Sequence, residues 1–308
     1  MNYIVTTTIF KPSLALKKFS NLKDWTLIVV GDLKTPHRLY QNNNKIIYLH
    51  PKEQEKMDKK LSDLIGWNCI QRRNFGYILA NKLNAEYIAT VDDDNIPLRD
   101  WGNEILLKKN ILVNYYKTKE IAFDPLSIFK NKKKIWHRGF PIELIFLKEK
   151  IKKKKIKIKA DIQANLWNDN PDIDAVNRIS FRNNELNFKF NDVKAYTSNK
   201  LSPFNSQNTI LTRKIIKDYF LFPFIGRMDD IWASYYVQSL GAKVIYAKST
   251  VKQIRNPHNL LLDFQKEVIG YANNLKLLNA LKISPNYIKK FLPKRSYAAF
   301  KQYKKNFL

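Results

Sequence analysis

The sequence has little of what is typical of secreted or membrane-embedded proteins. Cys69 is the single cysteine in 308 residues, so no disulfide can form within the chain, and a reducing compartment is the simplest interpretation. No stretch of uncharged apolar residues approaches the length of about 18 that a transmembrane helix needs. Residues 1–10 have neither a basic segment nor a small-residue cleavage site, so no signal peptide is predicted. We therefore expect a cytoplasmic protein, which would meet a membrane only peripherally, at its inner face.

Acidic residues are also scarce. The chain has 27 Asp and Glu against 55 Lys and Arg, a formal net charge of +28. Such a surface attracts anions, which include nucleic acid, acidic lipid headgroups and phosphorylated substrates. Lys, Asn and Ile are so abundant that an AT-rich coding bias accounts for part of this charge. Apolar residues make up 44% of the chain and aromatic residues 13%, which excludes a disordered protein.

Short apolar runs alternate with helix-like stretches in the N-terminal third of the chain. Strands are expected at 2–9, 25–30, 45–49 and 87–91, and helices at 51–64 and 69–83. This alternation predicts an α/β fold with a mostly parallel central sheet flanked by helices. From residue 259 onward the pattern is helical and basic. We expect one domain over residues 1–260 and a basic helical C-terminal extension over 261–308.

Three aspartates follow the apolar strand that ends at Val91. Asp92, Asp93 and Asp94 would repel one another and would be costly to desolvate at the end of a buried strand. A divalent cation removes both problems, because Mg²⁺ or Mn²⁺ prefers oxygen ligands and can link carboxylates to nucleotide phosphates. The alternative is a solvated Asp-rich turn. The preceding apolar strand favours a metal site.

Two further acidic pairs stand where helices begin. Asp172 and Asp174 follow Pro171, and Asp229 and Asp230 follow a glycine and an arginine. Acidic residues in a first helical turn are ordinary capping. The second pair precedes Trp232, whose indole could cover the apolar face of a sugar while the carboxylates accept its hydroxyls.

The remaining candidates are cationic or imidazole side chains. Arg138 has the planar fork that suits a diphosphate, and Arg72 and Arg73 could contribute to the same clamp. His258 follows a predicted strand and is either a metal ligand or a helix cap. The Lys148–Lys159 run is an exposed hairpin or a lysine-rich edge strand. The basic tail either lies on anionic lipid as an amphipathic helix or packs against the domain.

Taken in order, these segments resemble a known family. Val91–Asn95, Arg138–Pro141, Leu166–Ala175 and Gly226–Trp232 are similar to motifs of the reversibly glycosylated polypeptides, the plant UDP-arabinopyranose mutases. Residues 253–264 look closer to the STELLO-type glycosyltransferase-like proteins. The resemblance covers residues 60 to 270. Two positions depart from the mutase pattern, since Asn95 stands where those proteins have cysteine and Phe140 where they have tyrosine.

The resemblance implies a GT-A fold, a UDP-sugar donor and Mn²⁺ or Mg²⁺. It implies that Asp92 and Asp94 contact the metal, with Asp92 and Asp93 at the nucleotide. It places Arg138 on the arginine that becomes glycosylated in the plant family, and Asp229 and Asp230 near the sugar or acceptor. Asp172 and Asp174 fall in the motif that we assign to the donor. In an inverting reaction, Asp229 or Asp230 would be the general base for the acceptor hydroxyl; a retaining reaction would need none.

We therefore expect a metal-dependent glycosyltransferase that moves a sugar from a UDP-sugar to a glycan or lipid-linked acceptor. The alternatives are a UDP-sugar mutase, a non-catalytic glycosyltransferase-like protein and a nucleic-acid-binding protein. The last is disfavoured because the sequence has no helix-turn-helix, zinc-finger or RNA-recognition signature, and a nucleic-acid binder has no need of three aspartates at a strand end.

Overall fold

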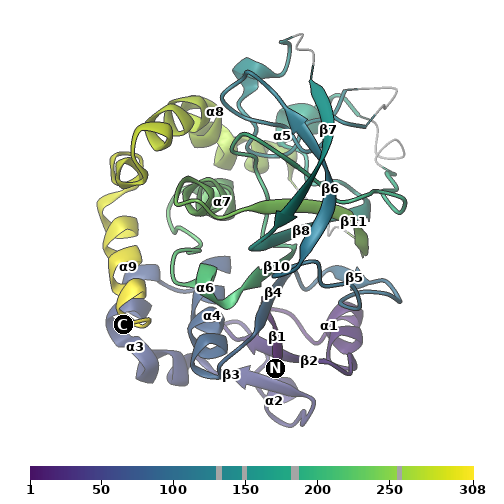
Figure 1. Ribbon diagram of the computed structural model, residues 1–308. Helices are drawn as coiled ribbons and strands as arrows, with labels where there is room; N and C mark the ends of the chain where they lie inside the picture. Colours follow the sequence, from purple (N-terminus) through teal and green to yellow (C-terminus); the bar gives the residue numbers. More distant parts are fainter. Residues whose placement is uncertain (130–133, 148–150, 182–186, 255–258) are drawn as a thin grey trace.

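The computed structural model describes residues 1–129, 134–147, 151–181, 187–254 and 259–308 (Figure 1). Its strands are β1 (Asn2–Thr7), β2 (Trp25–Val30), β3 (Ile46–Leu49), β4 (Tyr87–Val91), β5 (Asn95–Pro97), β6 (Asn110–Lys117), β7 (Lys152–Lys159), β8 (Ile162–Asp169), β9 (Tyr196–Ser198), β10 (Asn208–Thr212) and β11 (Val244–Gln253). Its α-helices are α1 (Leu14–Phe19), α2 (Arg38–Gln41), α3 (Pro51–Ile65), α4 (Arg73–Lys82), α5 (Ala175–Ile179), α6 (Arg213–Ile216), α7 (Asp229–Ser239), α8 (Leu260–Ile283) and α9 (Lys294–Lys305). Short 3₁₀ turns are η1 (Ile70–Arg72), η2 (Ile142–Leu144), η4 (Gly226–Met228) and η5 (Pro285–Lys290).

The strands form one sheet in the order β3-β2-β1-β4-β10-β8-β11-β9-β6-β7, and β5 pairs with β11. The first four strands in this order are parallel, as the alternation of strands and helices predicts. The Ile- and Val-rich segments of β1, β2 and β4 are buried on both faces, because helices cover the sheet on each side (Figure 1). Ile4 and Val5 of β1 accordingly belong to two different apolar clusters.

Beyond β4 the sheet is mixed rather than mostly parallel. β10 lies between β4 and β8 and is antiparallel to both, with Asn208 opposite Val91 and Thr212 opposite Tyr87. The residues that precede β10 therefore lie at the same edge of the sheet as the aspartates that follow β4. At the far end, β7 is an edge strand whose lysines are exposed, which agrees with a lysine-rich edge.

The C-terminal helices run along one side of the molecule and bring the chain end beside α3 (Figure 1). On α9 the buried face includes Phe300 and Tyr303, whose rings pack against Phe220. The structure therefore supports packing against the domain, because the apolar face of α9 is already occupied. Within the described part of the chain, no helix is both long and apolar enough to cross a membrane.

Candidate active site

A cavity of about 830 Å³ opens at the carboxyl ends of β1, β2 and β4. Thr8 reaches it after β1, Asp32 after β2, and the three aspartates after β4. In open α/β sheets this edge is the usual place for a ligand, because the loops that leave parallel strands converge there. The other sequence-predicted residues that line the same cavity are Arg73, Arg138, Asp172, Asp229 and Asp230.

Asp92 is held by an arginine that is itself fixed. Arg73 Nη2 lies 2.7 Å from Asp92 Oδ1, and Arg73 Nη1 donates to Thr90 and Ser206. Burial lowers the pKa of Arg73, but the charge and hydrogen bond of Asp92, together with Tyr77 and Tyr219, outweigh it and the net shift is upward. The Arg73 side chain is 1% exposed, whereas that of Asp92 is 27% exposed. Arg73 lines the cavity and positions Asp92, and its role in a diphosphate clamp stays a prediction.

The carboxylates of Asp92 and Asp94 provide the donor set for a cation. Asp93 differs, because Thr8 Oγ1 donates to its carboxylate and burial raises its pKa. Within the described residues, no group of three or more His, Cys, Asp or Glu side chains could hold an ion by itself. Mg²⁺ is commonly bound by one or two carboxylates together with substrate phosphates and water. Asp92 and Asp94 fit that arrangement, while His258 lies outside the described residues.

Arg138 joins two buried carboxylates at the inner end of the cavity. Its Nε lies 2.9 Å from Asp172 Oδ1, and its Nη1 lies 3.1 Å from Asp230 Oδ1. Nη1 also donates to the carbonyl oxygen of Arg227. Although burial alone lowers the pKa of Arg138, the charges of Asp172 and Asp230 raise it well above its usual value. A guanidinium held in this way stays protonated, so it is unsuited to accept a sugar as a nucleophile.

The two aspartates that begin α7 have different surroundings. Asp230 accepts hydrogen bonds from both Arg138 Nη atoms and from Ser206 N and Oγ. Asp229 accepts one hydrogen bond, at 2.7 Å, from Gln71 Nε2. Burial and then the neighbouring Asp230 charge raise the pKa of Asp229 to about 7, against the lowering effect of Arg138. Of the two, Asp229 has the properties of a general base at neutral pH.

Three predicted site residues lie outside the cavity. Trp232 is 0% exposed and donates from Nε1 to Asn274 of α8, so it cannot cover a sugar. Asp174 caps α5 by accepting from Asn177 N, which agrees with the capping interpretation, and it also accepts from Trp136 Nε1. Asp174 does not line the cavity.

Arg72 is the third of these residues, and it packs beneath the loop that follows α3. Its guanidinium carbon lies 3.6 Å from the centre of the Trp67 ring, and its Nε donates to Gln54. The side chain is 0% exposed. Arg72 therefore supports the cavity wall formed by residues 66–69 and does not reach the diphosphate, contrary to the prediction.

The structure adds residues that the sequence motifs did not reveal. Gln71 and Ser206 bond the catalytic candidates Asp229 and Asp230, and Asp32 accepts from the backbone of Asn68 and Cys69. For Asp32 a signal existed, since it follows a predicted strand that belongs to the same sheet edge. Lys266 of α8 and Arg295 of α9 also line the cavity, and only tertiary packing brings them there.

Comparison with known proteins adds a sequence relative. No protein-family model matches the chain. Over 225 residues it is 22% identical to a protein of Arabidopsis thaliana described as probable glycosyltransferase STELLO2. The chain is therefore similar in sequence to a probable glycosyltransferase. The aligned region covers 68% of this chain and 29% of that protein, so the chain spans less than a third of its relative. The similarity agrees with the STELLO-type part of the resemblance and does not specifically support the mutase family.

The solved structures to which the chain is similar include mannosyltransferase PcManGT from Pyrobaculum calidifontis in complex with GDP-Man and Mn²⁺. The alignment has a TM-score of 0.35 and 10% sequence identity, and it covers 97% of this chain and 73% of that one.

Proposed function

We propose that this protein is a metal-dependent glycosyltransferase that uses a nucleotide-sugar, with a UDP-sugar as the first candidate donor. The observation that carries the proposal is a single cavity, at the carboxyl ends of parallel strands, that joins Asp92 and Asp94 to Asp229. Two carboxylates suited to a cation and a third suited to proton transfer are what metal-assisted sugar transfer requires. The sequence similarity to a probable glycosyltransferase supports the same reaction class.

Charge supports the need for a cation. The cavity is lined by seven aspartates and five Arg or Lys residues, a formal excess of two negative charges in a protein of charge +28. An anionic nucleotide-sugar would be repelled by such a lining. One divalent cation at Asp92 and Asp94 would bring the formal charge of the lining to zero. When bound, this ion would supply Lewis-acid stabilisation of the diphosphate that leaves.

Asp229 is the proposed general base of an inverting transfer. Its carboxylate takes the proton of the acceptor hydroxyl while the acceptor oxygen bonds to the anomeric carbon and the bond from that carbon to the donor phosphate breaks. Gln71 fixes one Asp229 oxygen through its 2.7 Å hydrogen bond. A pKa of about 7 leaves a substantial fraction of Asp229 deprotonated at neutral pH while keeping it a competent base.

Arg138 and Asp230 are proposed as positioning residues. Arg138 ties Asp230 at the start of α7 to Asp172 on the opposite wall, and Ser206 fixes Asp230 from a third side. Because Asp230 lies in the first turn of α7 and adjoins Asp229, movement of this network would displace the base. Its charge also contributes to the raised pKa of Asp229.

The C-terminal helices are proposed to complete the donor site. Arg295 of α9 is anchored by donating to the carbonyl oxygens of Asp63 and Leu64, and it stacks over the ring of Phe224. Together with the exposed Lys266, it supplies cations at the cavity that are not tied to an active-site carboxylate. We therefore propose residues 1–260 as the catalytic domain and residues 261–308 as an extension that contributes phosphate contacts.

A thermal-shift experiment tests this function. The full chain is melted with UDP, GDP, ADP and CDP, each with and without Mn²⁺, because a ligand that binds only the native state raises Tm. We expect one nucleotide to raise Tm only when Mn²⁺ is present, and Asp94→Asn to lose the increase. Asp24→Asn, an equal charge change at an exposed residue away from the cavity, serves as control and should keep it.

The alternatives give different results in follow-up experiments on the nucleotide that binds. A mutase would isomerise the sugar of the donor without an acceptor, and a transferase would release nucleotide only when an acceptor is added. A non-catalytic protein would bind the donor but would release no nucleotide with any acceptor. Stabilisation by no nucleotide, together with salt-sensitive stabilisation by RNA, would overturn the proposal.

A further inference from the structure

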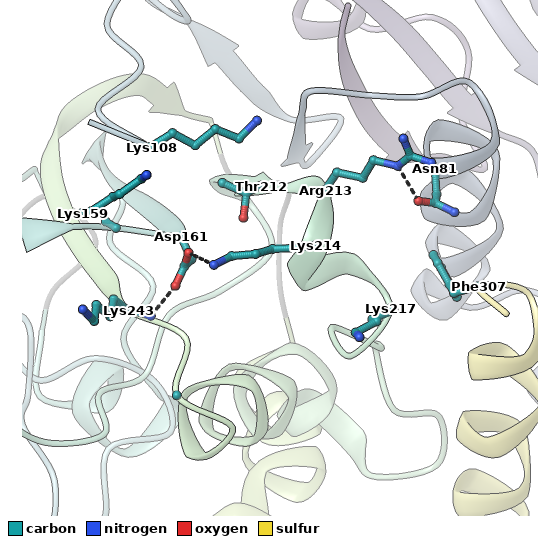
Figure 2. Close-up of a pocket in the computed structure, with 12 residues that line it drawn as sticks. Asn81, Lys108, Lys159, Asp161, Thr212, Arg213, Lys214, Lys217, Lys243 and Phe307 are labelled. Carbon is teal, nitrogen blue, oxygen red and sulfur yellow. Dashed lines mark hydrogen bonds and ion pairs between the residues drawn. The ribbon is translucent and has the colours of Figure 1, made fainter. Parts of the chain in front are cut away.

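A second cavity, of about 920 Å³, lies at the opposite end of β4 and β10 from the candidate active site. Figure 2 shows the residues that line it. Thr212 in its wall pairs with Tyr87, the first residue of β4, whereas the aspartates of the active site follow the last residue of that strand. Five residues of strand at about 3.3 Å each separate the two levels by roughly 15 Å. We call this second site the basic cavity.

The charged residues of the basic cavity are nearly all cationic. Around it stand one carboxylate, Asp161, and six cations, Lys108, Lys159, Arg213, Lys214, Lys217 and Lys243 (Figure 2). They come from four separate parts of the chain, so the cluster is produced by the fold and is no run of lysines in the sequence. Asp161 offsets only one of these six charges, because it is paired with Lys214 and otherwise accepts from the backbone of Lys243.

Among the described residues, several of these cations have no counter-charge. Lys108 has a distant partner in Glu86, at 3.5 Å, and Arg213 donates to the neutral Asn81. For Lys159, Lys217 and Lys243, the described part of the chain offers the ammonium group neither an ion pair nor a hydrogen bond. Several positive charges around one cavity raise the electrostatic potential inside it. An anion that binds there is therefore attracted by several of them at once.

The chemistry of the lining indicates a phosphate with several charges. Lysine ammonium groups and one guanidinium provide many N–H donors, which match the many oxygens of a phosphate better than a single carboxylate. The Thr212 hydroxyl is also buried in the wall without a hydrogen-bond partner among the described residues. We propose that the basic cavity binds a multivalent phosphate anion, free in solution or on a lipid headgroup, independently of the proposed transferase site.

Calorimetric titration of the full chain with tripolyphosphate in the presence of EDTA tests the proposal, because EDTA removes any metal-dependent binding at the active site. The test variant is Lys159→Gln/Lys217→Gln/Lys243→Gln. The control is Lys56→Gln/Lys60→Gln/Lys276→Gln, which removes the same charge from exposed helical lysines that line neither cavity. We expect the test variant to bind about tenfold more weakly, from three charge contacts of surface strength, and the control to bind like the wild type.

A reciprocal variant strengthens the test. Asp161→Asn removes the one carboxylate of the cavity while its amide oxygen can still accept from Lys243, so it should bind tripolyphosphate more tightly than the wild type. Equal weakening in the test and control triple variants would show diffuse attraction to a basic surface and overturn the proposal. Absence of binding at millimolar tripolyphosphate would also overturn it.

Vesicle flotation distinguishes the sources of the phosphate. Vesicles of phosphatidylcholine with phosphatidic acid that bind the wild type, and release the test variant, would identify a lipid headgroup. Tripolyphosphate binding without vesicle binding would identify a soluble ligand. Either result supports a phosphate site. If single-stranded RNA binds through the same lysines and tripolyphosphate fails to compete, the cavity is a nucleic-acid site and the proposal is wrong.

Discussion

The Arg138 network permits a quantitative prediction about stability. Arg138→Met removes a cation that is paired with Asp172 and Asp230, whose side chains are 2% and 7% exposed. Two carboxylates would then remain buried beside each other with their main counter-charge gone. Breaking a buried ion pair from one side costs about 3–5 kcal/mol. A domain of ordinary stability, about 5–15 kcal/mol, would survive this loss but would be marginal.

Urea unfolding followed by tryptophan fluorescence measures this loss. At pH 7.5 we expect the free energy of unfolding to fall by about 3–5 kcal/mol. At pH 5 the loss should be smaller, because buried carboxylates without a partner take up protons readily and an uncharged carboxyl is less costly to bury. Arg38→Met, on an exposed helical turn, is the matched control and should change stability by less than about 0.5 kcal/mol.

A second variant separates charge from packing. Arg138→Met/Asp230→Asn removes one of the two carboxylates as well, so it should recover part of the lost stability at pH 7.5 and show a weaker pH dependence than Arg138→Met. A loss below about 1 kcal/mol, as at an exposed ion pair, would refute the reasoning. So would an equal loss at both pH values, because that would assign the effect to packing alone.

Three further predictions concern the roles of individual residues. Asp229→Asn should lower kcat by at least about a hundredfold with little change in donor Kd, since the loss of a general base affects the chemical step; an unchanged kcat would exclude the role. The wild-type rate should rise with pH through about 7, as Asp229 loses its proton, and Asp229→Asn should lose that dependence. Trp232→Phe should reduce stability by about 1–3 kcal/mol, because the Asn274 side-chain oxygen loses its buried hydrogen-bond donor. The KM for the nucleotide-sugar should stay unchanged, and a raised KM would show that Trp232 contacts the substrate.

Much of the parallel part of the fold could be predicted from the sequence. The segments that form β1, β2, β3 and β4 are short, rich in Ile and Val, and separated by helix-like stretches. The spacing of their apolar residues and their composition therefore both indicate strands. The Asp triplet could be placed at a ligand-binding edge for the same reason. Trp232 could not be placed, because a tryptophan beside two aspartates has the same sequence signature in a sugar site and in a core. Only the packing of α8, which brings Asn274 to the indole, distinguishes the two.

The position of β10 explains why half of the candidate-site residues could not be predicted from the rule that ligand-binding residues follow the strands. In a parallel sheet, the residues that follow a strand reach the ligand, and this rule finds Asp32 and Asp92. β10 is antiparallel to β4, so the residues that precede it, rather than those that follow it, reach the same edge. Ser206 therefore bonds both Arg73 and Asp230 and links the half of the cavity that is proposed to bind the metal to the half that is proposed to carry the base. The residues that follow β10 lie instead in the basic cavity, so one strand reversal supplies residues to both sites.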